Sequence, residues 1–247
     1  MDAKYLAVED IMAIHYELVE EFSTSDNPIF PPGPRDMNLV HSAVTRPKTS
    51  LGTTEKYNSI YSKASAIFHS LAKNHAFHNG NKRTALVSLL VYLDRHKIRF
   101  EASDDELFDF VIAVADDKFG PKGNAKNADQ IVSSISDWVE EHTKKGNKRP
   151  REMKVSEFLK KCQMAGCRVR AQGKGGSWLV LGPNNGSVKI SKSTNQLTGA
   201  VVRRYLQDIG IAAVQMGISV DEFQEGVKPE QAQIVRFRNV LNRLAHA

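Results

Sequence analysis

The sequence predicts a multidomain protein, in which an all-α helical bundle precedes a small α+β domain of order αβββα and a C-terminal helix. Apolar residues recur every three or four positions through most of residues 8–142, as in amphipathic helices. Three short runs of strand-forming residues follow residue 166, between Gly-rich and Asn-Gly turns. A charged stretch without apolar residues, Thr143–Glu152, separates the two patterns. We expect domains at 1–145 and 154–212, a basic linker at 146–153 and a helical tail at 213–247.

Six helices are expected in the first domain. Val8–Phe22 places Ile11, Ile14 and Leu18 on one face. The other helices are expected at Asp36–Val44, Tyr57–Lys73, Lys82–His96, Asp104–Ala115 and Asp129–His142. Lys82–His96 is apolar on most sides and should be central. Of the intervening segments, Asn27–Pro34 is too rich in proline for a helix, and Arg46–Thr54 is either a loop or a small hairpin.

The second domain should begin and end with a helix. Val155–Ala165 is amphipathic and stops at Gly166, and Leu197–Ile209 stops at Gly210. The strands between them are expected at Cys167–Ala171, Trp178–Leu181 and Ser187–Ser191. A further helix is expected at Pro229–Ala245.

Charge differs between the two parts of the chain. Residues 1–145 contain 17 Lys+Arg and 21 Asp+Glu, for a net charge of −4, whereas residues 146–247 contain 17 and 7, for +10. A basic second half favours a polyanionic partner such as RNA. The alternative is an even scatter of lysines that serves solubility.

Composition also limits the class of protein. No apolar run reaches the roughly 18 residues that a membrane span requires, and the amino terminus lacks the basic and apolar regions of a signal peptide. Two cysteines are too few for a disulfide framework. We therefore expect a cytoplasmic protein without a membrane partner.

The stretch HAFHNGNKRT, residues 75–84, places polar and basic groups at the entrance of the central helix. The first N–H groups of a helix lack partners and carry the positive end of its dipole. Gly80, just before that start, lets the backbone curl around an anion, and Asn81, Lys82 and Arg83 add donors. His75 is placed to act as a base near neutral pH. The pattern predicts a phosphate cradle, the alternative being a polar helix cap.

This stretch closely resembles the motif of the Fic/Doc family, His-x-Phe-x-Asp/Glu-Gly/Ala-Asn-Gly/Lys-Arg. Tyr5–His15, Val87–His96 and Phe100–Glu106 look like the segments that flank the motif in the death-on-curing (Doc) branch, and the resemblance covers roughly residues 4–140. It implies a Fic-fold enzyme that transfers phosphate or AMP from ATP, or another nucleoside triphosphate, to a hydroxyl on a protein.

The resemblance also assigns roles to residues. It implies that His75 deprotonates the target hydroxyl, that Asn81 and the backbone around Gly80 hold phosphate oxygens, and that Arg83 pairs with a further phosphate. Lys82 stands where AMP-transferring members have Gly, and the Doc branch, which phosphorylates its target, carries Lys. The catalytic residues would be His75, Lys82 and Arg83.

Three further positions follow from the same comparison. Phe77 would anchor the loop, and Thr45–Glu55 matches the flap that clamps target backbone by strand pairing. Asn79 departs from the motif, because it replaces the Asp/Glu that holds Mg²⁺. An amide oxygen can bind Mg²⁺ but contributes less than a carboxylate, so we expect weak Mg²⁺ binding with the nucleotide.

The αβββα segment resembles the HicA toxin family, whose fold is like that of double-stranded-RNA-binding domains. Val155–Cys167 carries the match, and Gly175–Trp178 and Gly199–Leu206 strengthen it. The family cleaves mRNA with a His that directly follows Gly-Ser, and Trp178 stands in its place. Since indole does not exchange protons at neutral pH, we expect RNA binding without cleavage. The candidate RNA-binding residues are Lys174, Lys189, Lys192, Arg203 and Arg204.

Two functions are compatible with these features. The first is a Doc-like toxin of the toxin–antitoxin or phage-defence type, acting on a Ser, Thr or Tyr hydroxyl of a protein such as a translation factor. The second is a catalytically impaired Fic-fold module that binds a nucleotide or partner. The family's inhibitory motif is absent, since Asp221 stands where Ser/Thr is required before Glu225. An antitoxin would therefore act in trans.

Overall fold

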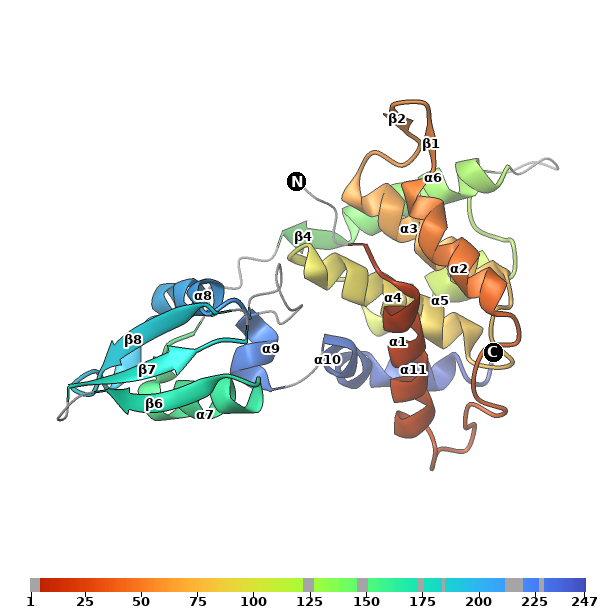
Figure 1. The fold of residues 1–247 in the computed structure, drawn as a ribbon. Helices are drawn as coiled ribbons and strands as arrows, with labels where there is room; N and C mark the ends of the chain where they lie inside the picture. Colours follow the sequence, from red (N-terminus) through yellow and green to blue (C-terminus); the bar gives the residue numbers. More distant parts are fainter. Residues whose placement is uncertain are drawn as a thin grey trace. The chain divides into compact units, whose positions relative to one another are not determined.

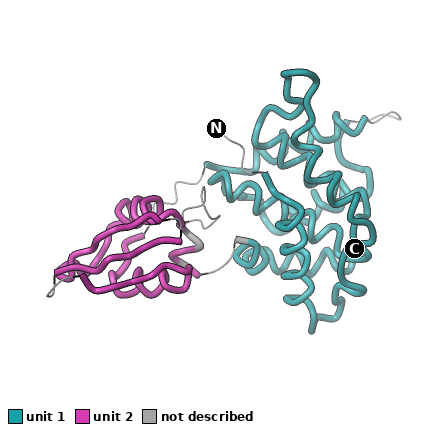
Figure 2. The backbone as a smooth tube through the Cα atoms, viewed as in Figure 1, with its two compact units in different colours: residues 1–146, 229–247 teal, residues 147–228 magenta. Residues whose placement is uncertain are grey.

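A computed structural model describes residues 5–121, 127–145, 151–172, 176–183, 185–211, 220–226 and 229–247. The chain forms two compact units (Figure 2). Unit 1 comprises residues 1–146 and 229–247, and unit 2 comprises residues 147–228. Unit 2 is thus inserted between two parts of unit 1, whereas the sequence predicts domains that simply follow one another.

Unit 1 contains the six helices expected from the apolar periodicity (Figure 1). They are α1 Val8–Glu21, α2 Met37–Thr45, α3 Ile60–Lys73, α4 Asn81–Arg95, α5 Asp104–Ala115 and α6 Ala128–Glu141. α3 begins three residues after the expected Tyr57, because the Ser59 hydroxyl accepts from the Ser62 N–H and fixes the first turn there.

Helix α4 is the central element of unit 1. It packs against α1, α3, α5 and α10 (Pro229–Arg236), and its residues from Arg83 to Leu93 are all buried. The core around it contains Phe22, Phe68 and Tyr92. Because the helix is buried on all sides, a ligand can reach it at few positions, and its N-terminus is one of them. The predicted phosphate cradle lies at this N-terminus.

The expected flap is a hairpin. A short 3₁₀ helix, Arg46–Lys48, leads into β1 Ser50–Leu51, which pairs antiparallel with β2 Thr54–Glu55. Of the two interpretations left open by the sequence, the hairpin is therefore the one found. Leu51 at its tip is 88% exposed.

Short strands border the expected linker 146–153, and the second begins at its last residue, Met153. Thr143–Lys145 forms β4, which pairs antiparallel with β3 Ile98–Phe100. Met153 is buried in β5 Met153–Lys154, which pairs with β9 Gln196–Leu197 in unit 2. Charged residues can form these edge strands because their side chains remain in solvent while the backbone pairs. Residues 146–150 lie outside the described residues.

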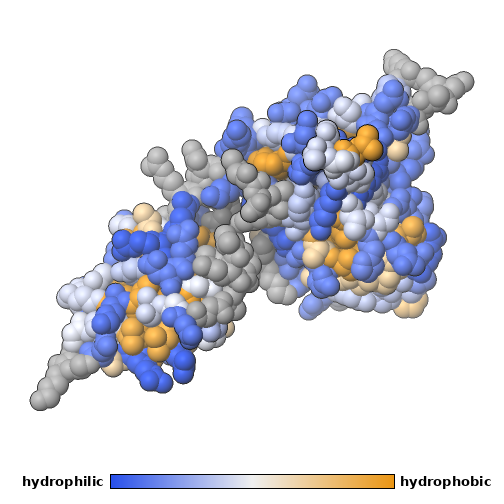
Figure 3. Space-filling model, turned by 45° about the horizontal axis from the view of Figure 1, so that its top comes forward, coloured by the Kyte–Doolittle hydropathy of each residue, from blue (hydrophilic) through white to orange (hydrophobic). Residues whose placement is uncertain are grey.

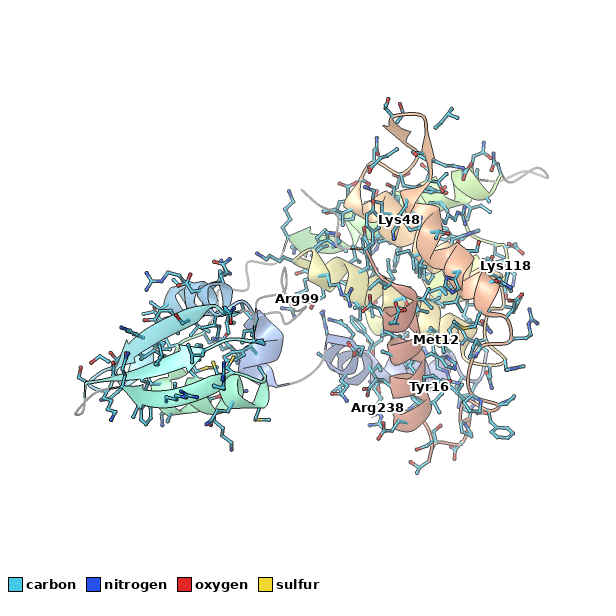
Figure 4. The ribbon with its side chains drawn as sticks, in the orientation of Figure 1. Met12, Tyr16, Lys48, Arg99, Lys118 and Arg238 are labelled. Atoms are coloured by element: carbon cyan, nitrogen blue, oxygen red, sulfur yellow. The ribbon has the colours of Figure 1, made fainter. Side chains whose placement is uncertain are left out.

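The C-terminal segment belongs to unit 1 and is not a separate tail. α10 packs against α4, and α11 Arg238–Arg243 packs against α5. Arg238 pairs with Glu21 at 2.7 Å, and Arg243 pairs with Asp105 at 2.6 Å. Figure 4 shows Arg238 beside α1, the helix that contains Glu21. The expected single helix is interrupted at Phe237, which is buried in the core.

Unit 2 contains the predicted elements in the predicted order, with two additional strands, β5 before α7 and β9 before α8; β9 includes Leu197, so α8 begins two residues after the expected start. α7 is Val155–Met164, the strands are β6 Arg168–Gln172, β7 Ser177–Leu181 and β8 Ser187–Ser191, and α8 is Gly199–Asp208. The strands form one antiparallel sheet in the order β6–β7–β8. Both helices cover one face, where Phe158 and Leu206 pack with Val180. A short helix, α9 Val220–Glu225, completes this unit, and residues 212–219 lie outside the described residues.

Within the part of the chain that the structure describes, no helix is both long and apolar enough to cross a membrane.

Candidate functional site

Gly80 sets the geometry at the start of α4. It is the N-cap residue and has left-handed backbone angles, φ 76° and ψ 14°. A Cβ atom at this position would lie 2.8 Å from Ile29 Cδ1, so a side chain here would also collide with the core. Glycine therefore meets two requirements, a backbone conformation that L-residues avoid and close contact with Ile29. The N–H groups of the first helical turn lie directly after it.

The proline-rich segment Asn27–Asp36 lies against the 75–84 stretch. The Phe30 carbonyl accepts from Asn79 Nδ2 at 3.3 Å, and the Gly33 carbonyl accepts from the His78 N–H at 3.3 Å. Pro34 and Phe77 form an isolated antiparallel bridge. These contacts hold the stretch in place from outside. The sequence identifies this segment as a loop but gives no signal that it supports the candidate site.

Phe77 is buried in the core beneath the stretch. Its side chain is 1% exposed and stacks on the buried His15 ring at 4.0 Å. His15 Nε2 accepts from the Gly33 N–H at 3.0 Å, so Nδ1 carries the proton and donates to Thr84 Oγ1 at 3.0 Å. A neutral His15 thus joins α1, the proline-rich segment and α4. His15 is therefore a core histidine with both ring nitrogens hydrogen-bonded.

Asn81 uses both atoms of its side-chain amide within the loop. Oδ1 accepts from the Phe77 N–H at 2.9 Å, and Nδ2 donates to the Phe77 carbonyl at 2.9 Å. The side chain therefore closes the turn between residues 77 and 81. The sequence assigns this amide a phosphate contact, whereas in the structure its partner is the loop, and the N–H groups of the first turn of α4 are the donors available to an anion.

His75 is exposed at the other end of the stretch. Its backbone has φ 50°, in the left-handed region, which brings the chain sharply out of α3. Asn74, the C-cap of α3, and the buried Ala76 flank it, so its backbone is fixed on both sides. The imidazole is therefore an accessible base on a well-supported loop.

Two cations lie at the start of α4. Lys82 Nζ donates to the Ala247 carbonyl at 2.7 Å, so residues from the far end of the chain reach this site. Arg83 is 3% exposed, donates to the Asn27 carbonyl at 3.3 Å and lies over the Phe22 ring. Burial lowers the pKa of Arg83 to about 10, which leaves it charged at neutral pH. A buried cation and a helix N-terminus together make this an electropositive site.

The residues present do not match a dedicated Mg²⁺ site. Asn79 supplies the side-chain oxygen at the motif's metal position, and this Oδ1 accepts from the Gly80 N–H at 2.6 Å. Among the described residues there is no cluster of three or more His, Cys, Asp or Glu side chains. Protein-bound Mg²⁺ normally has at least one carboxylate ligand. We therefore derive no step through a protein-held metal.

Comparison with known proteins gives this geometry a context. Residues 5–93 match the Fic/DOC family. The match begins just before α1 and ends in α4, so it includes the complete 75–84 stretch and the proline-rich segment that supports it. Over 71 residues the chain is 37% identical to a protein named Toxin Doc from Mycolicibacterium smegmatis. That alignment covers 29% of this chain and 55% of the relative, so the chain spans about half the length of the relative that it matches.

The candidate RNA-binding residues of unit 2 do not share one surface. Lys189 is exposed on the face of the sheet opposite the helices. Lys192 lies over the Trp178 ring at 5.0 Å, and Trp178 itself packs partly buried against the core beneath the helices. Arg203 and Arg204 are exposed on α8. Lys174 lies outside the described residues.

Because two of its histidines are buried, the protein should lose free energy of unfolding in acid. Burial lowers the pKa of His15 and of His69 to about 4, helped by the charges of Arg83 and Arg46 respectively. Their ordinary pKa is 6.5, so the unfolded chain binds more protons between pH 6.5 and 4. The free energy of unfolding should therefore decrease as the pH is lowered from 6.5 to 4. The decrease is at most about 1.4 kcal/mol per pH unit for each histidine.

Urea denaturation at pH 7 and pH 5 measures this dependence. We expect His15→Gln to reduce the loss of stability between the two pH values, whereas the exposed His41→Gln should leave it unchanged. An equal loss in His15→Gln and in the native protein would show that His15 does not titrate as the structure indicates.

Proposed function

We propose that unit 1 is a Doc-like Fic-fold transferase that moves phosphate from a nucleoside triphosphate to a hydroxyl on a protein. The observation that carries this proposal is the arrangement at α4: a left-handed Gly80 before the first N–H groups of the helix, with Lys82 and Arg83 beside them and an exposed His75. The family match and the similarity to a Doc toxin support it. By the same relationship, the protein acts as a toxin that an antitoxin neutralises in trans.

The chemistry follows from the groups at the site. A ring nitrogen of His75 takes the proton from the target hydroxyl as its oxygen attacks the terminal phosphorus. The new O–P bond forms while the bond from that phosphorus to the β-phosphate oxygen breaks, and the nucleoside diphosphate leaves. Positioning and charge stabilisation dominate phosphoryl transfer, and here the N–H groups of α4, Lys82 and Arg83 supply the positive charge.

Reactions with ATP labelled at two different phosphates test the proposal. The full chain is incubated with a bacterial lysate and with ATP labelled at either the γ- or the α-phosphate. We expect protein-bound label from γ-labelled ATP alone, since Lys82 occupies the position at which AMP-transferring relatives have Gly. Label from the α position would instead show AMP transfer. No labelled protein in either reaction would contradict the transferase proposal.

The alternative is a Fic-fold module that binds a nucleotide or partner without transfer. The side chain of Asn79 favours this alternative, because its amide is engaged by Phe30 and Gly80 and brings no negative charge. Nucleotide binding without turnover in the labelling reaction would support it.

Replacing Asn79 with the Asp of the family motif distinguishes an enzyme that binds Mg²⁺ weakly from a protein without transferase activity. We expect Asn79→Asp to tighten Mg²⁺ binding and to raise the rate of transfer, because a carboxylate is a stronger Mg²⁺ ligand than an amide. The side chain is exposed, so the fold should be retained, although the bond to the Phe30 carbonyl is lost because a carboxylate cannot donate. Calorimetric Mg²⁺ titration in the presence of ATP measures the effect, with Asn79→Ser as the uncharged control. Equal Mg²⁺ affinity in the two variants would contradict the placing of Asn79 at a metal position.

For unit 2 we propose RNA binding without cleavage. Residues 147–228 contain 14 Lys+Arg and 6 Asp+Glu, a net charge of +8, and Arg203 and Arg204 are exposed side by side on α8. The resemblance to HicA supports an RNA partner. With Trp178 in the position of the catalytic histidine, this unit has no base at that position.

The salt dependence of binding tests this second proposal. We expect Arg203→Ala/Arg204→Ala to weaken binding of all RNA sequences and to reduce the slope of log affinity against log salt by about one to two. Filter binding by the full chain at several salt concentrations gives the slope, and a gel shows whether RNA is cut. An unchanged slope would remove α8 from the RNA surface, and cleavage would contradict the interpretation of Trp178.

A further inference from the structure

The sheet of unit 2 has one face that no described element of this unit covers. Strand register places Trp178 and Val180 of β7 beside Ile190 and Val188 of β8, on the face packed against the helices. Leu179 alternates with these residues and so lies on the opposite face. β8 follows the same alternation, with Val188 and Ile190 buried and its other three residues exposed.

The open face has an apolar centre and basic flanks. Leu179 pairs in register with Arg170 on one side and Lys189 on the other. Leu181, the next residue on this face, pairs with Arg168. Both leucines are partly buried, whereas the three basic side chains are exposed. Figure 3 shows on unit 2 an apolar patch of this kind, bordered by hydrophilic side chains.

The charge on this face is of one sign. Of the nine strand residues that register places there, three are basic and none is acidic; the others are the two leucines, three serines and Gln172. Neighbouring strands lie about 4.8 Å apart, so the Cα atoms of Arg170 and Lys189 are roughly 10 Å apart across Leu179. One extended segment fits between the arginines of β6 and Lys189 of β8 at this spacing.

We propose that the open face of the unit 2 sheet, formed by Arg168, Arg170, Leu179, Leu181 and Lys189, docks an acidic protein segment that carries aliphatic side chains. Carboxylates of the segment pair with the two arginines and the lysine, and its apolar residues cover the leucines. Arginine is favoured at protein interfaces because its planar guanidinium binds a carboxylate through two hydrogen bonds.

The chemistry of the face favours protein over nucleic acid. Sheets that bind single-stranded nucleic acid present aromatic side chains on which bases stack. The one tryptophan of this sheet, Trp178, lies on the covered face, and the open face contains aliphatic leucines. This docking site shares no residue with the α8 arginines proposed for RNA or with the transferase site.

Fluorescence anisotropy with the full chain tests the proposal. The probe is a short labelled peptide in which leucines alternate with aspartates, compared with peptides in which lysine replaces aspartate or serine replaces leucine. We expect only the aspartate–leucine peptide to bind. Arg170→Glu/Lys189→Glu should weaken it at least about tenfold, because like charges then face each other. Leu179→Ser should weaken it without altering the salt dependence, because no charge is removed.

Arg203→Glu/Arg204→Glu is the matched control, with the same change of charge on α8. It should retain peptide binding, and circular dichroism should show both double variants folded. Peptide binding that is absent in the native protein, or equal in the two double variants, would overturn the proposal. Single-stranded RNA that binds the native chain and is lost in Arg170→Glu/Lys189→Glu alone would assign the face to nucleic acid instead.

Discussion

His75→Ala should abolish transfer of phosphate to the target protein and leave the fold unchanged. General-base catalysis contributes roughly 10²–10⁴-fold to the rate, so the loss should exceed a hundredfold. The side chain is exposed, and its removal opens no cavity in the core. Labelling from γ-labelled ATP, together with the thermal midpoint of unfolding, measures both effects.

The neighbouring His78 provides the matched control. It is exposed in the same loop, and its main chain is engaged through the bond from its N–H to the Gly33 carbonyl. His78→Ala should therefore keep the native rate. If both alanine variants lose activity, the imidazole of His75 has no special role and the loop itself is what matters. An active His75→Ala protein would remove the histidine from the mechanism.

Gly80→Ala should have the largest effect on stability, because two unfavourable terms act together. A left-handed backbone costs an alanine about 1–2 kcal/mol, and forcing a methyl group to within 2.8 Å of Ile29 Cδ1 adds roughly 1–3 kcal/mol. We expect unfolding free energy to fall by about 2–5 kcal/mol. Phosphate binding should fall as well, since the first turn of α4 must shift to relieve the contact.

Two further variants separate these terms. Gly52 also has a left-handed backbone, with φ 60°, but a methyl group added there would meet no atom within 4 Å, so Gly52→Ala reports the backbone term alone. Ile29→Val removes the Cδ1 atom and should recover part of the loss when combined with Gly80→Ala. Urea denaturation gives the coupling free energy of the double variant. Equal losses in Gly80→Ala and Gly52→Ala would show that Ile29 exerts no steric constraint.

The sequence is sufficient to predict the helices of unit 1 because periodic burial is a local property. α1 and α5 have the expected starts, α3 begins where Ser59 caps it, and α4 lies within one residue of the expected bounds at both ends. The three strands of unit 2 are found within one or two residues of their expected positions for the same reason.

Contacts between distant segments are what the sequence does not predict. The proline-rich loop is locally irregular, and only the fold shows Gly33 bonded to His15 and Phe30 bonded to Asn79. Likewise, the return of the C-terminal segment to unit 1, and the contact of Ala247 with Lys82, span more than half of the chain. The motif indicates which groups are present at the site, and the fold determines which of them, such as Asn81, already have partners.

The central claim is that the start of α4 holds the phosphates of a nucleotide whose terminal phosphate His75 helps to transfer. The most direct test is a crystal structure of the full chain with a non-hydrolysable ATP analogue. We expect phosphate oxygens within hydrogen-bonding distance of the N–H groups that follow Gly80, with Lys82 Nζ on a phosphate in place of the Ala247 carbonyl. A triphosphate bound elsewhere, or none bound at saturating analogue concentration, would contradict the claim.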